Sequence, residues 1–357
     1  MQKILIISNV FPLENNQSRG CYILSQAKLL KSNGFDVRIL NPLPLIPKFY
    51  TKFNQRFIGT NKVEPERTVE GIKVFHPRYI RFPRDLFAKI NLIPRKSILT
   101  KTSTWLYDWN PEIVHLHGIH PLLNTGIKIS KKYKSKLFIT VHGWDFDIGI
   151  FNKNIKKTVK AHANKIDGIC VVNKIHLLTA KEFFKEEQIN LIPCHFDIEK
   201  KNMKNINNFD YDANKIKILF PADPSRKEKN YKLFNQTIRE LRKRGWAIET
   251  KHLENISREK IIEKFHWADL ILLTSDREGG PLVTKEAIFC GARVVSTSVG
   301  DTMEWLPSNS ISLEKNPSSL ATCVENALKN KYDVWKIPKK YEKEDVLKKL
   351  VELYHIN

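Results

Sequence analysis

The chain has 357 residues, which is longer than a usual single domain and predicts two domains of similar size. Its 60 lysines and arginines outnumber its 38 aspartates and glutamates, and the formal charge of +22 indicates an anionic partner: a phosphate group, a nucleic acid or an anionic lipid. Five scattered cysteines without a C-x-x-C spacing argue against a disulfide framework or a zinc site, and no apolar run reaches the roughly 18 residues of a membrane span.

The first half of the chain alternates strand-like and helical segments. KILIIS at 3–8 predicts a first strand rather than a secretory signal, because its apolar run is short and soon meets Pro12. A helix ending at Gly34 and a strand at 36–40 follow, which makes a βαβ opening. Further strands are predicted at 113–117, 136–143 and 168–172, with helices at 120–132, 154–164 and 175–186.

Residues 48–108 combine positive charge with aromatic side chains. This segment holds 13 lysines and arginines against 5 aspartates and glutamates, interleaved with aromatic residues. Such a mixture suits an anionic lipid surface, which Arg78, Arg81 and Arg84 would contact. The alternative is that the aromatics belong to a core while the lysines are solvated. No groove-binding or base-stacking signature is present, so nucleic acid is not expected as a partner.

The second half repeats the alternation after a polar interruption. Residues 195–214 lack apolar periodicity and predict a linker. A final amphipathic helix is predicted within 341–357. Between them, residues 215–340 hold predicted strands at 215–222 and 247–253, helices at 230–244 and 257–266, and a β-loop-α-β unit at 269–298.

Two glutamates flank the loop and helix of that last unit. The run DLILLTS at 269–275 predicts a buried strand, and ligands of parallel sheets bind at the carboxyl ends of strands. Glu278 lies in the loop that follows, and Glu286 lies more than one turn along the next helix. Pro281 suits the first helical position and Gly291 the left-handed residue after the helix. Either the two carboxylates share a ligand cleft, or both are ordinary solvated helix charges.

The same region carries a resemblance to a known family. SDREGGPLVTKEAIFCGARVVSTSVGDTME at 275–304 resembles the block S-x-x-E-G-x-P-L-V-x-x-E-A-x-x-C-G-x-x-V-V-x-T-x-V-G-x-x-x-E of the family-4-type retaining glycosyltransferases, the glycosyl transferases of group 1. Shorter matches run through most of the chain: FP-x6-RG at 11–20, H-G-x-D at 142–145, R-x-x-K-N at 226–230 and the final helix LKKLVELY.

The resemblance implies the α/β GT-B fold, in which two doubly wound Rossmann-like domains face each other across a cleft. Residues 1–194 would form the acceptor-side domain and residues 215–340 the domain that binds the nucleotide sugar. The helix within 341–357 would pack back on the first domain. The activity implied is transfer of a sugar, with retention, from a nucleotide-diphosphate sugar to a glycan or lipid-linked acceptor in cell-surface polysaccharide biosynthesis.

The resemblance also implies roles for single residues of this chain. Glu278 would contact the sugar hydroxyls of the donor and Glu286 the ribose, tasks that suit carboxylates because each accepts several hydrogen bonds. His142 would lie beside the reacting sugar, which makes His142 and Glu278 the catalytic candidates. The remaining donor-binding candidates are Gly20, Arg226, Lys229, Gly279, Gly280, Pro281, Leu282 and Val283. The acceptor-side candidates are Arg19, His117 and Asp145.

Several positions depart from the family pattern. Ala-Asp at 222–223 replaces Gly-Arg, so we expect the carboxylate of Asp223 to turn away and Arg226 to pair with Lys229 around the diphosphate. Gly280 stands where a larger residue is common, which predicts a more open sugar pocket. Asp-Phe-Asp at 145–147 matches the D-x-D metal motif of the other glycosyltransferase fold, but the doubly wound pattern makes a coincidence the better interpretation.

The expected protein is therefore a metal-independent hexosyltransferase that needs no cofactor other than its nucleotide-sugar co-substrate. It would act in the cytoplasm, either unattached or peripheral on the inner face of the membrane through residues 48–108. Two alternatives stay open: a phosphorylase, hydrolase or epimerase on the same fold, and a non-enzymatic basic module that binds an anionic polymer. The second alternative predicts that Glu278 and Glu286 are dispensable.

Overall fold

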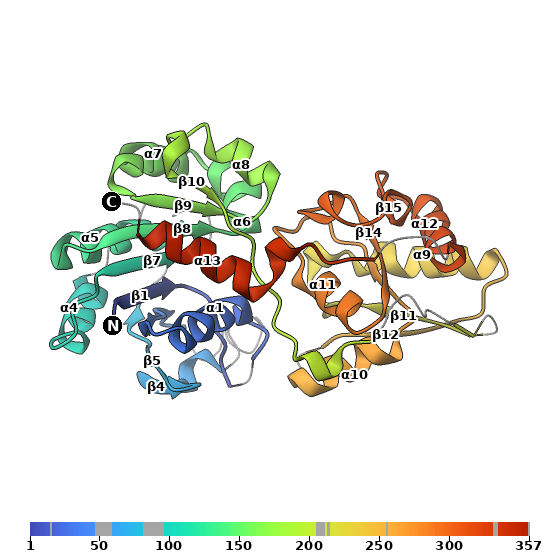
Figure 1. Cartoon of the computed structure of the whole chain (residues 1–357), viewed down its shortest axis with the longest axis horizontal. Coiled ribbons are helices and arrows are strands. Elements are labelled where there is room, and N and C mark those ends of the chain that lie inside the picture. Colours follow the sequence, from blue (N-terminus) through green and yellow to red (C-terminus); the bar gives the residue numbers. More distant parts are fainter. Residues whose placement is uncertain are drawn as a thin grey trace. The chain divides into compact units, whose positions relative to one another are not determined.

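The computed structural model describes residues 1–14, 16–46, 59–80, 96–204, 211–212, 215–254, 256–330 and 335–355. The chain forms two compact units (Figure 1). The first consists of Met1–Pro193 with Val346–Asn357, and the second of Cys194–Asp345. Each unit has its own sheet and its own hydrophobic core, so each is described by itself.

The first unit is built on a sheet whose described strands follow the order β10-β9-β8-β7-β1-β2-β5-β4. Neighbouring strands pair in parallel, except that β4 and β5 form an antiparallel edge. Because β1 lies between β2 and β7, the strand order reverses at β1. The strands are β1 (Lys3–Ser8), β2 (Asp36–Leu40), β4 (Glu66–Val69), β5 (Ile72–Phe75), β7 (Ile113–His117), β8 (Lys136–Val141), β9 (Gly168–Val171) and β10 (Ile189–Leu191).

Alternation along β1 divides the core of the first unit into two layers. Ile4 and Ile6 belong to one layer, and Leu5 and Ile7 to the other, because successive side chains of a strand point to opposite faces. Helices α1 (Cys21–Ser32) and α13 (Lys343–Tyr354) cover the first layer, as Figure 1 shows, and α5 (Leu123–Tyr133), α7 (Lys153–His162) and α8 (Lys174–Ala180) cover the second. The last helix of the chain thus packs on the N-terminal sheet.

The second unit has a parallel sheet whose described strands follow the order β12-β11-β13-β14-β15. Its strand order reverses between β11 and β13. One core cluster fills the unit, with apolar residues from both sheet and helices. The strands are β11 (Ile216–Phe220), β12 (Ile248–His252), β13 (Leu270–Leu273), β14 (Arg293–Thr297) and β15 (Ile311–Ser312). The helices are α9 (Tyr231–Lys243), α10 (Arg258–Trp267), α11 (Leu282–Phe289) and α12 (Pro317–Lys329).

Both units are Rossmann-like, as the sequence predicts, although β4, β5 and α12 are not among the predicted elements and several element ends differ. The strand expected at 136–143 ends at Val141, because a short helix, α6 (Gly143–Asp147), begins there. Pro281 is the residue before α11 rather than its first residue, whereas Gly291 has the expected left-handed backbone with φ +92°. The described part of the expected linker includes a 3-10 turn, Lys200–Asn202, while residues 205–210 and 213–214 lie outside the described residues.

The basic aromatic segment is described only in part, since residues 47–58 and 81–95, with Arg81 and Arg84, lie outside the described residues. Arg78 is half-buried and donates hydrogen bonds to the carbonyl oxygens of Thr60, at 2.6 Å, and Val63, at 2.7 Å. Its guanidinium thus holds the protein's own backbone, which favours the core interpretation for this part. In the described ranges, no helix is long and apolar enough to cross a membrane.

Candidate functional site

In the second unit the site candidates gather where the strand order reverses. Strands β11 and β13 are neighbours there, and the loops that leave their carboxyl ends lie on the same edge of the sheet. This is the place where open α/β sheets bind ligands. The loop after β11 brings Lys229, and the loop after β13 brings Glu278. Two residues 49 positions apart in the chain therefore meet.

Glu278 and Lys229 form an ion pair that is mostly shielded from solvent. The ammonium of Lys229 binds Oε1 of Glu278, and the hydroxyl of Ser275 donates to the same oxygen at 2.7 Å. The side chain of Glu278 is 13% exposed and that of Lys229 is 10% exposed. The hydroxyl of Thr274 donates to the carbonyl of Lys229 at 3.1 Å and so fixes the backbone of the lysine. The pair offers a cation for an anionic group and a carboxylate for hydroxyl groups.

Glu286 is buried and has a partner that the sequence analysis missed. Arg258, the first residue of α10, donates to both carboxylate oxygens of Glu286, at 2.6 and 3.0 Å, and also to the carbonyl of Asp197 at 2.9 Å. Because the Glu286 side chain is only 11% exposed, it is not a solvated helix charge. The sequence offers one signal for Arg258: Ser257 before it is a residue that caps helix starts, which predicts that Arg258 begins a helix.

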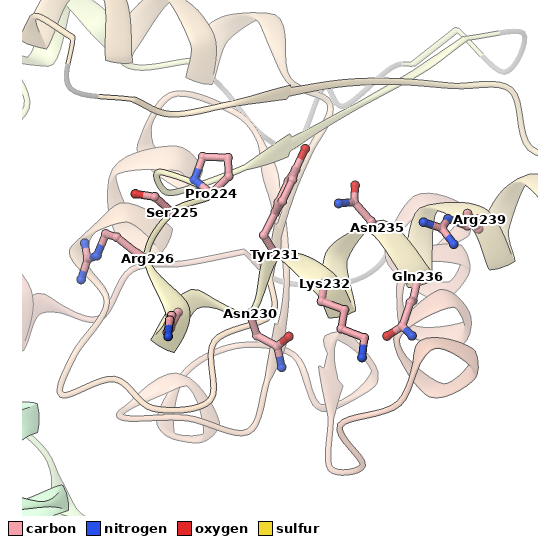
Figure 2. Close-up of a pocket in the computed structure, with 10 residues that line it drawn as sticks. Pro224, Ser225, Arg226, Asn230, Tyr231, Lys232, Asn235, Gln236 and Arg239 are labelled. Carbon is pink, nitrogen blue, oxygen red and sulfur yellow. The ribbon is translucent and has the colours of Figure 1, made fainter. Parts of the chain in front are cut away.

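Arg226 lines a groove next to the loop that carries Lys229. Its guanidinium donates to Oε1 of Glu228 at 2.8 and 2.9 Å, and Asp223 accepts from the amide of Ser225 at 2.8 Å. The guanidinium of Arg226 is thus held by Glu228 here, and its pairing with Lys229 around a bound diphosphate stays a prediction. Figure 2 shows the groove, of about 530 Å³, between this loop and the face of α9. It is lined by Pro224, Ser225, Arg226, Lys227, Asn230, Tyr231, Lys232, Asn235, Gln236 and Arg239.

The glycine pair before α11 is packed against a neighbouring loop. A Cβ added to Gly280 would lie 3.2 Å from Oδ2 of Asp301, so the carboxylate of Asp301 limits the room for a larger residue at this position. The more open sugar pocket stays a prediction. Gly279 lies beside the same loop, since a Cβ on Gly300 would lie 2.8 Å from the carbonyl oxygen of Gly279. Pro281 precedes α11, and Leu282 and Val283 form its first turn, where backbone N–H groups favour anions.

In the first unit, Arg19 and Gly20 shape the loop that leaves β1 at its reversal point. Arg19 donates to the carbonyl oxygens of Phe11, at 2.9 Å, and Asn9, at 2.5 Å. Gly20 has φ +65°, and a Cβ there would approach the backbone of Val10 to 3.0 Å. Both residues therefore hold this loop compact, and a bulkier side chain at Gly20 would displace it.

Histidines lie at the ends of two neighbouring strands, β7 and β8. His117 closes β7 and His142 follows β8, and their rings stack with Nδ1 of His117 3.2 Å from Nε2 of His142. Tyr22 of α1 packs on the other side of His142, with ring centroids 4.5 Å apart. Burial lowers the pKa of His142 to about 3 and the pKa of His117 well below its usual value. Both imidazoles are thus neutral at neutral pH and act as hydrogen-bonding groups, not as charged acids.

Asp145 organises the loops that carry these histidines. It is buried and accepts from the amides of Ile119, at 2.8 Å, and His142, at 3.0 Å, while burial raises its pKa to about 6. Asp147 instead contacts Nε2 of His176 at 2.9 Å. Within the residues described, no group of three or more histidine, cysteine, aspartate or glutamate side chains is arranged to hold a metal ion.

His115 has a structural role, because both of its ring nitrogens contact hydroxyl groups inside the first unit. Nδ1 lies 2.6 Å from the hydroxyl of Tyr354 in α13, and Nε2 lies 2.7 Å from the hydroxyl of Thr140 in β8. The histidine is fully buried, and burial lowers its pKa to about 3. It therefore ties the last helix of the chain to the sheet of the first unit.

Family models match both units. The model for Glycosyltransferase Family 4 matches residues 21–200, and the model for glycosyl transferases group 1 matches residues 226–345. TuaC of Bacillus subtilis (strain 168), a proposed teichuronic acid biosynthesis glycosyltransferase, is 25% identical over 180 residues, which are 48% of this chain and 43% of TuaC. The match thus spans less than half the length of that relative.

Solved structures share the fold over nearly the whole chain. Sucrose-phosphate synthase from Thermosynechococcus elongatus superposes with a TM-score of 0.65 at 13% identity, covering 99% of this chain and 96% of its own. HepE of Anabaena, in complex with UDP and glucose, has a TM-score of 0.64 at 14% identity and coverage of 99% of both chains. With both family models matched and the GT-B fold of two Rossmann-like domains in place, the chain belongs to the family 4, group 1 glycosyltransferases.

Proposed function

We propose that this chain is a retaining glycosyltransferase that moves a hexosyl group from a nucleotide-diphosphate sugar to a glycan or lipid-linked acceptor, in the cytoplasm and for a cell-surface polysaccharide. The observation that carries the proposal is the Lys229–Glu278 pair at the strand-order reversal of the second unit. A shielded cation and carboxylate at that point match a ligand that is anionic at one end and rich in hydroxyl groups at the other.

The reaction would use these groups in distinct ways. When a donor binds, its diphosphate competes for the ammonium of Lys229, which leaves Glu278 to accept hydrogen bonds from sugar hydroxyls. Glu286, held at both oxygens by Arg258, would read the two ribose hydroxyls. As the bond from the anomeric carbon to the diphosphate breaks, Lys229 and the first turn of α11 oppose the growing negative charge. The acceptor hydroxyl oxygen then forms the new bond to that carbon, and its proton passes to the departing diphosphate.

Side-chain cations that oppose the leaving-group charge make a metal ion unnecessary in this proposal. In the first unit, neutral His142 would hold the sugar or the acceptor by hydrogen bonds. Gly20 would let the loop after β1 pack against the backbone of Val10. Arg19, His117 and Asp145 would hold the loops of the acceptor side in place. HepE of Anabaena, which has the same fold, is described in complex with UDP and glucose, and this supports a nucleotide-sugar donor.

The test is ligand-dependent stabilisation followed by transfer. Thermal unfolding with UDP-, GDP- and ADP-sugars should single out one donor, since only a ligand that binds the folded protein raises its melting temperature. With that donor, Glu278→Gln and Glu286→Gln should each lower kcat/KM at least about ten-fold, because loss of a charged hydrogen bond costs roughly 1.5–3 kcal/mol.

The matched control is Glu325→Gln, which also removes a paired, mostly shielded carboxylate, in this case the partner of Arg244. It should leave transfer unchanged. Wild-type transfer rates in Glu278→Gln would mean that the donor does not bind at this glutamate, whereas a wild-type protein that no nucleotide sugar stabilises and that transfers no sugar would favour the binding-module alternative. Release of free or epimerised sugar without transfer would favour the phosphorylase, hydrolase or epimerase alternative.

A further inference from the structure

The second unit contains an ion pair that is buried more deeply than the pair at the proposed donor site. Lys285 lies in α11 directly before Glu286, and its ammonium is 2.8 and 3.1 Å from the two carboxylate oxygens of Asp301. Both side chains are 1% exposed. The same ammonium lies 4.3 Å from the ring centre of Tyr341 and 5.1 Å from that of Trp305, so aromatic faces enclose the charge.

Burying such a pair is not in itself a route to stability. Removing two charges from water costs more than their attraction regains unless the geometry is good, and apolar replacements are often equally stable. The position of the pair is therefore the informative feature. The ammonium of Lys285 is also 3.5 Å from the carbonyl oxygen of Pro281, the residue at which α11 starts. The pair thus joins the helix start to the loop after β14.

The backbone around the pair is packed as tightly as glycine permits. A Cβ on Gly300 would lie 2.8 Å from the carbonyl oxygen of Gly279 and 2.9 Å from that of Glu278, and the φ of Gly300 is +55°. A Cβ on Gly280 would lie 3.2 Å from the carboxylate of Asp301. Two glycines on facing loops therefore let the Asp301 loop lie directly on the backbone that carries Glu278.

We infer that the Lys285–Asp301 pair is a positioning device for the donor loop, residues 276–281, and hence for Glu278. The inference rests on the proposed function for its catalytic meaning, while the positioning itself concerns only the second unit. Lys285 and Asp301 are too buried to touch a substrate. They act by holding the loop against residues 299–301, so that the side chain of Glu278 stays where Ser275 and Lys229 meet it.

The experiment removes both charges together. Lys285→Met with Asp301→Asn nearly keeps side-chain volume and leaves no unpaired buried charge, whereas each single change leaves one and should lower the melting temperature well below that of the double variant. Amide hydrogen exchange of residues 276–283, measured without ligand, should become at least ten-fold faster in the double variant. The KM for the donor should rise at least five-fold.

A matched control removes another ion pair of the same unit. Arg244→Met with Glu325→Gln breaks a pair between α9 and α12 and should leave exchange at residues 276–283 and the donor KM unchanged. Wild-type exchange in the Lys285→Met, Asp301→Asn protein would overturn the inference. If no nucleotide sugar binds even the wild-type protein, the proposed function fails, yet the exchange result still decides whether the pair holds the loop.

A second variant covers the case in which the double variant does not fold. Gly280→Ala adds one methyl group at 3.2 Å from the Asp301 carboxylate and leaves both charges in place. It should also accelerate exchange at residues 276–283, because the loop must move away from Asp301. Slow, wild-type exchange in Gly280→Ala would equally overturn the inference.

Discussion

Acid should destabilise the first unit, because it holds histidines that stay neutral inside the fold. Burial lowers the pKa values of His76, His115 and His142 to about 3, and that of His117 well below its usual value. A histidine in an unfolded chain titrates near about pH 6.5. Below that pH the unfolded chain binds more protons than the folded chain, so the free energy of unfolding falls as the pH falls from about 6.5 towards about 3.

The size of the effect follows from these pKa values. Between pH 7 and about pH 5.5, each such histidine lowers the free energy of unfolding by slightly more than about 1 kcal/mol, so four independent ones lower it by about 5 kcal/mol. Asp145 acts in the opposite direction, because burial raises its pKa to about 6 and the folded protein then binds the proton first. This effect of Asp145 offsets about 1 kcal/mol of the loss. The net decrease in the free energy of unfolding is then about 4 kcal/mol, which is a large share of the roughly 5–15 kcal/mol that is typical of folded proteins.

Urea unfolding at pH 7 and at about pH 5.5 measures this difference, with a signal from the first unit. His115→Gln should reduce the difference by about 1 kcal/mol, since one neutral histidine is removed. His355→Gln, at an exposed position after α13, is the control and should leave the difference unchanged. The reasoning is refuted if His115→Gln and the wild-type protein lose the same free energy between the two pH values.

Three further predictions concern charge. Lys229→Ala should lower donor kcat/KM more than Arg226→Ala, because Lys229 contacts Glu278 whereas Arg226 is bound to Glu228; equal losses would contradict this. Transfer should survive EDTA, since side-chain cations oppose the leaving-group charge, and activity that EDTA abolishes and manganese restores would disprove it. Arg78→Ala should lower the melting temperature through two lost carbonyl contacts without changing binding to anionic vesicles, and weaker vesicle binding would show that Arg78 contacts lipid.

The order and type of the main elements could be predicted from local sequence. Short β-branched runs such as ARVVSTS at 292–298 end at glycines or polar loops, and they alternate with helices of one apolar stripe, which is enough to indicate two doubly wound sheets. Gly291 reads correctly as a left-handed residue after a helix, because that requirement is local. Pro281 was placed one residue too far into its helix, because a proline also suits the position before it.

The partners of charged side chains could not be predicted in this way. Nothing in the sequence near Glu286 points to Arg258, 28 residues earlier, and nothing near Arg226 decides between Lys229 and Glu228. The close approach of the Asp301 carboxylate to Gly280 likewise has no signal in the local sequence. Such pairs depend on which loops the sheet order brings to one edge, and on distances that local patterns do not encode.

The sequence by itself determined the two Rossmann-like domains, the family resemblance and the loop on which Glu278 lies, because periodicity, turn residues and motif spacing are properties of short segments. Only the tertiary structure decided that Glu278 faces Lys229, that Lys285 and Asp301 are buried together, and that burial lowers the pKa values of His115 and His142. The physical reason is that ion pairing and burial arise between segments distant in the chain, once strand order has placed their ends side by side.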